Sequence, residues 1–336
     1  MDGIIAEYLA GASLGAPISH DSITVFPIFA PQTAEQHKYL VMGEAIDREI
    51  LQITEISEGG SVPQLMAVNT GKSGVLIIDG EYILGGRQDR VINTTIMLAP
   101  ESKTTIPVSC IEHGRWRETS REFHAADCAM SQDIRKKKMR SVSESLKQKS
   151  SYESDQREVW NEVAGLNQRA GAQSATGAMK DGFDAKKQDV EGFTRAFPIQ
   201  PHQRGLLALF NGIVAGFEMI SQQEAFFKLY NKLLTSYAID AVFIKPRPVR
   251  KSEISSAAKT FLADIRNCNA ESYPSVGLGR DYRFGGNGKI GSALVVESVP
   301  AYLSFYTMEE PPRPPVHMGG GFQRRRAHVM RRNAEE

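Results

Sequence analysis

The sequence predicts an α+β protein. We expect an antiparallel β-rich N-terminal region that is sandwich- or barrel-like, a helical middle segment and a smaller α/β C-terminal region. Short apolar or alternating runs recur about every 10 to 12 residues between Ile23 and Cys110, which is typical of antiparallel strands. Ser, Gln, Lys, Glu and Ala then dominate residues 119–196, and strongly apolar patterns return after Pro198. The predicted segments are 1–118, 119–197, 198–308 and a disordered tail at 309–336.

The N-terminal elements follow directly from these runs. Residues 4–10 predict a short helix that ends at Gly11. Gly, Pro, Asn or Asp separates most of the strand-like runs that come next. These runs are SITVFPIF, KYLVMGEAI, ILQITEI, LMAVN, GVLIIDGEYIL, VINTTIML and TIPVSCI.

Two helices are predicted in the middle segment. The first is long and polar and covers DIRKKKMRSVSESLKQKS. The second is amphipathic, covers ESDQREVWNEVAGLNQRA and takes Ser154 as its N-cap. Toward the C-terminus, Asn211-Gly212 between apolar runs predicts a hairpin with a type I′ turn. Ser221 is expected to cap the next helix, QQEAFFKLYNKLLTSYAI. A further helix in KSEISSAAKTFLADIRNC and two strands in SALVVESVPAYLSFYT complete the predicted elements.

The composition narrows the class of protein. Of 336 residues, 41% are hydrophobic and 24% are charged, which is ordinary for a soluble globular chain. A net charge of +1 gives no general attraction to nucleic acid or to acidic membranes. The N-terminus lacks the basic region of a signal peptide, and no apolar run approaches the length of a membrane span. Because three cysteines in so long a chain fit a reducing compartment, we expect a cytoplasmic protein without a membrane partner.

A polar cluster interrupts the apolar runs between Gly80 and Trp116. Arg and Asp beside buried strands cost several kcal/mol unless they are paired or used. We therefore interpret the stretch as the wall of a polar site. Its polar residues are Arg87, Gln88, Asp89 and Arg90, followed by Glu112, His113, Arg115 and Trp116.

The same stretch resembles a bacterial and archaeal domain family. That family is named for its association with ADP-ribosylglycohydrolases and the rhodanese-phosphatase superfamily. The resemblance covers about residues 15–308, and its second part includes SDQREVWNEV and the block from Phe210 to Ala241. His113 departs from the pattern, which more often has Gln there. The matching motif positions are Gly80, Glu81, Gly85, Gln88, Asp89, Arg90, Asn93, Ile106, Pro107, Val108, Ser109, Cys110, Glu112, Gly114, Arg115 and Trp116.

The resemblance and the residue chemistry together suggest roles. The planar forks of Arg90 and Arg115 suit phosphate, and Trp116 suits stacking on a base or ribose. Glu112, as general base or ribose partner, and Gln88, as an orienting residue, are the candidate catalytic residues. The alternative is a buried Arg–Glu network that ties the strands to the helices. Asn93 and Gln156 complete the predicted ligand-binding set.

A zinc site is a second, weaker hypothesis. Cys110, His113, His124 and Cys128 have the spacing C-x2-H-x10-H-x3-C, and zinc takes four Cys or His ligands. The order is unusual, and the family pattern does not require the two histidines. The alternative is a buried strand cysteine with exposed histidine neighbours, and the predicted site residues therefore include no metal ligand.

Two basic clusters remain. In the first, Arg135, Lys136, Lys137, Lys138 and Arg140, we expect a solvated helix face. The second lies in the tail, and we expect nucleic acid to be bound only through these arginines. Deleting the tail should leave folding nearly unchanged. Its arginines are Arg324, Arg325, Arg326, Arg331 and Arg332.

Two functions follow as hypotheses. The first is binding or processing of a nucleotide-like ligand, possibly an ADP-ribose derivative, in an intracellular regulatory or phage-defence setting. The second is a non-enzymatic scaffold or partner subunit that oligomerises and binds another protein or nucleic acid. A solvent-reachable pocket where Gln88, Arg90, Glu112 and Arg115 converge favours the first, and a closed, mutually satisfied network favours the second.

Overall fold

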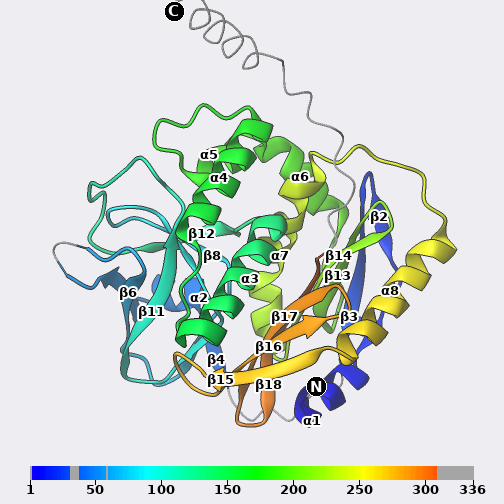
Figure 1. Ribbon diagram of the computed structural model, residues 1–336, viewed down its shortest axis with the longest axis horizontal. Helices are drawn as coiled ribbons and strands as arrows, with labels where there is room; N and C mark the ends of the chain where they lie inside the picture. The colour runs from blue at the N-terminus through cyan, green and yellow to red at the C-terminus, as the bar shows by residue number, and fades with distance from the viewer. Residues whose placement is uncertain (1, 31–37, 58–59, 309–336) are drawn as a thin grey trace, which may run out of the picture.

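The computed structural model describes residues 2–30, 38–57 and 60–308. It confirms the predicted α+β class: the N-terminal part is rich in strands, helices gather in the middle, and further strands follow near the C-terminus (Figure 1). Within these ranges, no helix has both the length and the apolar character that crossing a membrane requires. The predicted tail at 309–336, with its arginine cluster, lies outside the described residues.

A large antiparallel sheet forms one half of the molecule. Its nine strands are β1 (Ser13–Leu14), β2 (Ile18–His20), β3 (Ile23–Phe29), β13 (Gln203–Phe210), β14 (Ile213–Ile220), β15 (Asn269–Pro274), β16 (Arg280–Gly286), β17 (Lys289–Val296) and β18 (Val299–Thr307). The order is β1-β3-β13-β14-β18-β17-β16-β15, with β2 also on β3. Because β3 pairs with β13, strands from both ends of the described chain share one sheet. The predicted segment boundaries at 118, 197 and 308 stay predictions.

A smaller β unit lies beside this sheet. Its strands are β4 (Tyr39–Val41), β5 (Leu51–Glu55), β6 (Gln64–Asn69), β7 (Gly74–Ile77), β8 (Glu81–Leu84), β9 (Arg90–Ile92), β10 (Ile96–Leu98), β11 (Ser102–Cys110) and β12 (His124–Ala129). They form a six-stranded sheet, β12-β8-β9-β11-β6-β5, and a three-stranded sheet, β10-β7-β4, around one apolar core. The pairing of β4 with β7 is parallel, whereas an antiparallel arrangement was predicted. The run KYLVMGEAI is a strand only as far as Val41 and then forms a helix.

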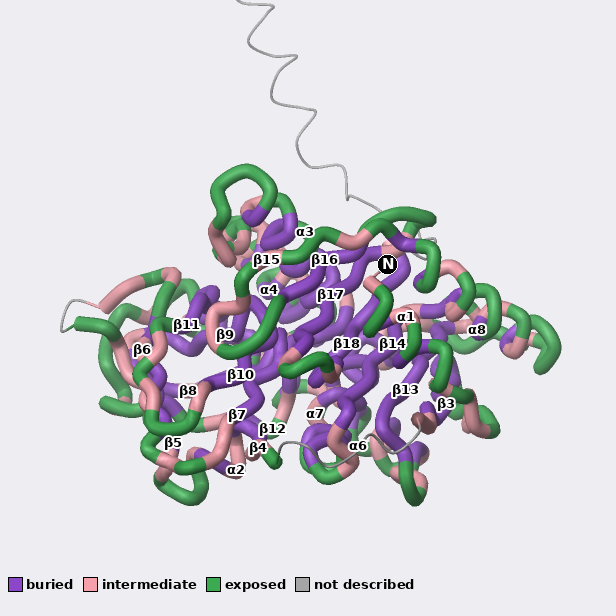
Figure 2. The backbone as a smooth tube through the Cα atoms, turned by 90° about the horizontal axis from the view of Figure 1, so that it is seen from below, coloured by how far each residue is buried: buried purple, intermediate pink, exposed green. Residues whose placement is uncertain are grey.

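Helices cover both faces of the large sheet, whereas one helix, α2 (Met42–Asp47), packs on the small β unit. The others are α1 (Gly3–Ala10), α3 (Gln132–Lys149), α4 (Gln156–Ala170), α5 (Met179–Ala185), α6 (Lys187–Ala196), α7 (Gln223–Ala241) and α8 (Lys251–Arg266). Side chains alternate along β13, so that Leu206 faces the core shared with α3 to α7, whereas Leu207 faces α1 and α8. Figure 2 shows the central strands of this sheet buried along most of their length.

The basic face of α3 corrects one sequence prediction. The solvated face expected for Arg135, Lys136, Lys137 and Lys138 is wrong, because all four residues are buried. Helix α3 lies between the small β unit and the large sheet, and acidic residues of both units approach it. Only Arg140 of this cluster has a largely exposed side chain.

The structure confirms one predicted turn and corrects two predicted helix caps. Asn211 and Gly212 both have positive φ, 47° and 84°, which confirms the predicted type I′ turn between β13 and β14. The N-cap of α4 is Asp155 rather than Ser154, because the Asp155 carboxylate accepts from two amides of the first turn. Helix α7 begins after Gln222, which makes no side-chain cap, and so Ser221 is not its cap.

Candidate functional site

The predicted motif folds into a tight turn and two strand ends. Residues 85–89 connect β8 to β9, and the loop after β11 brings Glu112 and Arg115 to the same place. Gly86 has a φ of +53°, and a Cβ atom there would lie 2.2 Å from the ring of Phe123. Only glycine fits so close to this ring in that backbone conformation. The turn therefore places the polar residues of β8–β9 against the β11 loop.

Arg115 is bound on every side by the protein. Its Nε donates to Glu112 Oε2 at 2.7 Å, and its Nη2 donates to Asp89 Oδ1 at 3.0 Å. Its Nη1 donates to the carbonyl oxygens of Gly86 and Arg117, at 2.8 and 2.9 Å. All three nitrogens of this guanidinium are thus engaged, and the side chain ties the turn to the loop.

The two carboxylates beside Arg115 have opposite pKa shifts. Burial would raise the pKa of Glu112, but hydrogen bonds from Arg115, from the neighbouring Thr176 and from the Asp89 amide lower it below 4.5. Burial raises the pKa of Asp89 above 3.8, although hydrogen bonds from the Gly85 amide and the Tyr82 hydroxyl oppose this. Glu112 is therefore an ionised carboxylate that is stabilised by hydrogen bonds from the protein. Its basicity is low for a general base at neutral pH.

Arg90 differs from Arg115 because its side chain is only partly satisfied. Its guanidinium is 0% exposed, and Nη1 donates to Gln88 Oε1 at 3.1 Å and to Cys110 Sγ at 2.8 Å. Among the described residues, neither Nε nor Nη2 has a hydrogen-bond partner. A buried donor without a partner costs about 1–3 kcal/mol in stability, and more for a charged group. The two unpartnered nitrogens of Arg90 are therefore unusual and require an explanation.

Trp116 lies at the outer edge of the cluster. Its side chain is one of the few large apolar ones that are well exposed, at 47%. The guanidinium carbons of Arg87 and Arg90 each lie 5.9 Å from the centre of its ring. Two cations therefore hold the ring while part of it stays open to solvent.

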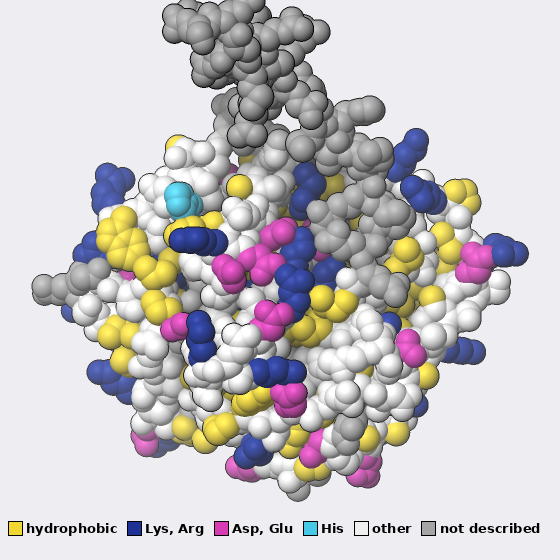
Figure 3. All heavy atoms as spheres, viewed as in Figure 1, with side chains coloured by type: hydrophobic (Ala, Val, Ile, Leu, Met, Phe, Trp, Pro, Cys, Tyr) yellow, Lys and Arg dark blue, Asp and Glu magenta, His cyan; other side chains and the backbone are white. Residues whose placement is uncertain are grey.

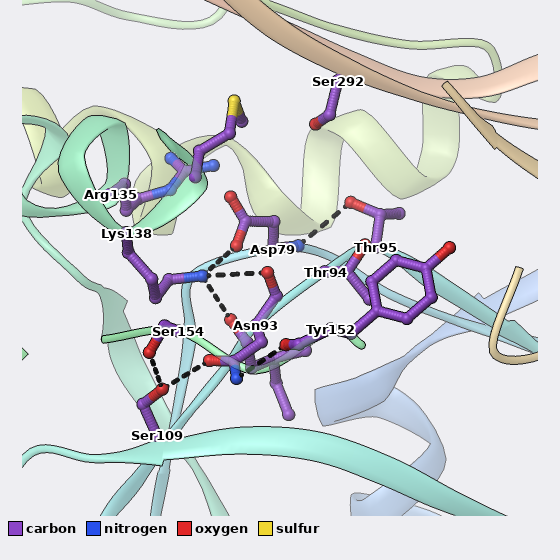
Figure 4. Close-up of polar contacts among 12 residues, drawn as sticks. Asp79, Asn93, Thr94, Thr95, Ser109, Arg135, Lys138, Tyr152, Ser154 and Ser292 are labelled. Atoms are coloured by element: carbon purple, nitrogen blue, oxygen red, sulfur yellow. Dashed lines mark hydrogen bonds and ion pairs between the residues drawn. The ribbon is translucent and has the colours of Figure 1, made fainter. Parts of the chain in front are cut away.

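The other face of the motif looks inward (Figure 4). Ser109 donates to Asn93 Oδ1 at 2.7 Å, and Asn93 Nδ2 donates to the carbonyl of Tyr152 at 3.1 Å. Gln156 donates to the Cys110 carbonyl at 2.7 Å and accepts from the Cys110 amide at 2.8 Å. Asn93 and Gln156 therefore connect the motif to the segment before α4 and to its first residue.

Three wholly buried ion pairs lie behind this face, and the sequence did not predict them. Lys138 binds Asp79 and also donates to the carbonyls of Ile92 and Asn93, where β9 ends (Figure 4). The other two pairs are Arg135 with Glu218, at 2.7 Å, and Arg283 with Asp281, at 2.6 Å.

Two of these pairs join the β units through α3, because Lys138 binds Asp79 of the small unit and Arg135 binds Glu218 of the large sheet. The third pair lies within β16. Tyr237, Tyr302 and Tyr306 all donate to Glu218, so its carboxylate is surrounded by donors. Burial lowers the pKa of Lys138, whereas Asp79 beside it acts in the opposite direction. A single acid within an apolar run is the sequence signal that indicates such buried pairs. Asp79 follows GVLII, and Glu218 lies in GFEMI.

The four predicted zinc ligands do not come together. In the described part of the chain, no group of three or more His, Cys, Asp or Glu residues could hold a metal ion. Cys110 contacts Arg90, and burial raises the pKa of its thiol to about 11. The ring of His113 lies edge-on to Trp160, with centroids 4.4 Å apart. His124 is exposed on β12, and burial raises the pKa of the Cys128 thiol to about 12.

A pocket of about 240 Å³ lies away from the motif, between β4, α2 and the start of α7. Four of its charged lining residues are paired with one another: Lys228 binds Glu44 at 2.7 Å and Glu224 at 2.9 Å, and Arg48 also binds Glu44. The surface over α3 shows similar mixing, with acidic and basic side chains next to each other in the middle of the face in Figure 3. Neither feature collects charge of one sign.

Comparison with known proteins identifies the family. Neither the search of curated proteins nor that of solved structures gave a match. The family model of the ARG and Rhodanese-Phosphatase-superfamily-associated Protein domain matches residues 11–306. This range includes the motif turn, the Trp116 loop, α3 and nearly all of the large sheet. The chain therefore belongs to the family of the ARG and Rhodanese-Phosphatase-superfamily-associated Protein domain.

Proposed function

We propose that the protein binds a nucleotide-like small molecule at the outer face of the motif, with the ligand's aromatic ring on Trp116. One observation carries this proposal: a half-exposed tryptophan ring lies directly beside a buried arginine, Arg90, that has unpaired donors. Stacking of a base on an aromatic side chain contributes roughly 1–3 kcal/mol. An association with ADP-ribose chemistry rests on the family name and belongs to the same proposal.

In this proposal the motif residues divide by role. Trp116 stacks on the ligand, Arg90 binds a polar group, and Gln88 orients Arg90 through its 3.1 Å hydrogen bond. Arg115 and Glu112 shape the turn, because their polar atoms are bound to the protein. The lowered pKa of Glu112 makes it a weak base, which supports binding in preference to turnover.

The alternative function keeps one specific observation in its favour. Ile56 and Val62 are exposed like Trp116, each at 39%, and the Val62 carbonyl lies 3.9 Å from the Cys110 thiol. Exposed apolar side chains beside a closed Arg115 network are also what a partner protein would contact. In that case the motif would be the rim of a protein interface in a non-enzymatic subunit.

A thermal-shift screen distinguishes the two functions. ADP-ribose, NAD, AMP and divalent metals are added to the full chain, and a ligand that binds the native state at a hundred times its Kd stabilises it by about 2.7 kcal/mol. We expect a nucleotide to raise the melting temperature of the natural protein and of Trp160→Phe, but not of Trp116→Ala. Trp160 is the matched control because its indole nitrogen has no partner in the described structure. No shift with any nucleotide, together with a stable oligomer, would favour the alternative.

A further inference from the structure

Glu55 and Arg90 form an incomplete pair beneath Trp116. Glu55 Oε1 accepts from the Arg87 amide at 3.2 Å and lies 3.7 Å from Arg90 Nη2, which is too far for a hydrogen bond. Glu55 Oε2 has no partner within the ranges that the structure describes, and the same holds for Arg90 Nε and Nη2. The side chains are 10% and 0% exposed. Two orphaned donor nitrogens and one orphaned acceptor oxygen therefore belong to the same buried pair.

The chemistry of this pair selects what it can bind. Buried polar atoms in native structures nearly always have a partner in the protein, in an ordered water or in a ligand, so these atoms mark a place for a small hydrogen-bonding group. A phosphate only accepts hydrogen bonds, so it would suit Arg90 but would be repelled by Glu55. An ammonium group would suit Glu55 and be repelled by Arg90. A hydroxyl donates one hydrogen bond and accepts two, and it satisfies both residues at once.

We propose that Glu55 and Arg90 together bind a sugar hydroxyl of the ligand, so that the site takes a ribonucleoside-type molecule whose phosphates stay outside the pair. The inference rests on the proposed function, since the ring on Trp116 supplies the base-stacking half of such a ligand. It assigns Glu55, which the motif did not include, to the site. It also replaces the sequence expectation that Arg90 holds phosphate.

The local structure holds the Glu55 carboxylate in a fixed position to accept a hydrogen bond from this hydroxyl. It ends β5, and its Oε1 is held by the backbone of the motif turn at Arg87. A Cβ on Gly86 would lie 2.9 Å from this oxygen, so glycine allows the carboxylate to approach the turn. Trp116, in contrast, lies outside any strand and is exposed, so its ring is the part of the site that a ligand reaches first.

The test compares AMP with 2′,3′-dideoxy-AMP, which keeps the base and the phosphate and lacks both ring hydroxyls. Binding is followed by tryptophan fluorescence in the Trp160→Phe background, where Trp116 is the remaining reporter. We expect AMP to bind about tenfold more tightly than the dideoxy compound, which corresponds to about 1.4 kcal/mol. Replacing Glu55 should reduce this ratio toward one. Glu55→Ala is the direct variant, and Glu55→Gln serves if the alanine variant does not fold, because its amide oxygen can still accept from Arg87.

The control is Glu118→Ala, which removes an exposed carboxylate near Trp116 and should leave the ratio unchanged. Equal binding of AMP and 2′,3′-dideoxy-AMP to the unaltered site would overturn the hydroxyl inference and leave the proposed function standing. A preserved ratio in both Glu55 variants would overturn the role of Glu55. If neither compound changes Trp116 fluorescence or the melting temperature, the proposed function fails as well.

Discussion

The guanidinium of Arg115 donates to protein oxygens from all three nitrogens, whereas two nitrogens of Arg90 lack a partner in the described structure. Both arginines belong to one motif, and both were predicted to hold phosphate. Residue type predicts that a guanidinium will bind an anion or an acceptor. It does not predict whether that acceptor is a ligand or a neighbouring carboxylate, because Asp89, one of the carboxylates that binds Arg115, lies 26 residues away in the sequence.

Arg115→Lys should therefore destabilise the fold even without ligand. Lysine keeps the charge but loses the planar fork, so Asp89 and the carbonyls at the turn lose donors. We expect the free energy of unfolding in urea to fall by roughly 1–3 kcal/mol. The exposed Arg117→Lys is the control and should change it little. Unchanged stability combined with weaker AMP binding would instead make Arg115 a direct ligand contact.

Glu112 should contribute to acid sensitivity. Its pKa is lower in the folded protein than the ordinary 4.5, so the unfolded state takes up the proton first as the pH falls. Its stabilising contribution is complete above pH 4.5 and is lost as the pH falls through the folded-state pKa. Glu112→Gln should accordingly show a smaller loss of unfolding free energy below pH 4.5 than the natural protein, measured by urea titration at each pH. If the free energy of unfolding falls equally below pH 4.5 in both proteins, protonation of Glu112 does not contribute to acid sensitivity.

At the level of elements, individual strands and helices were largely predictable, but their partners were not. The 10–12-residue rhythm and the Asn211-Gly212 turn are local signals, and the structure follows them. The pairing of β3 with β13 joins segments far apart in sequence, which no local pattern encodes. The sequence of α3 alone predicts a solvated helix because Asp79 and Glu218, the acids that neutralise two of its cations, lie far from it in the sequence.

The pair Lys138–Asp79 provides a test at this scale. Lys138→Met leaves Asp79 buried without its cation, so we expect a loss of about 3–5 kcal/mol in the free energy of unfolding. Adding Asp79→Asn should recover part of that loss, because the remaining group is neutral. Arg140→Met removes an exposed cation of the same helix and should have little effect. A small effect of Lys138→Met would mean that the pair is not buried in solution.

The whole molecule is expected to unfold as one cooperative unit. Two buried ion pairs of α3 connect the small β unit to the large sheet, and one apolar core includes residues from both. Tryptophan fluorescence reports Trp116 and Trp160, whereas near-UV circular dichroism also reports the tyrosines of β18. We expect the two probes to give the same urea midpoint. Separate midpoints would mean that the two β units unfold independently.

Gln156 exchanges two hydrogen bonds with the backbone of Cys110, so a side chain occupies the place that a neighbouring strand would take. The amide proton of Cys110 is consequently protected from solvent deuterium by α4 and not by a β-ladder. Its exchange rate therefore records how often the first turn of α4 detaches from β11. In Gln156→Ala this one amide should exchange faster, whereas the Ser109 amide and its neighbours along β11 should keep their protection.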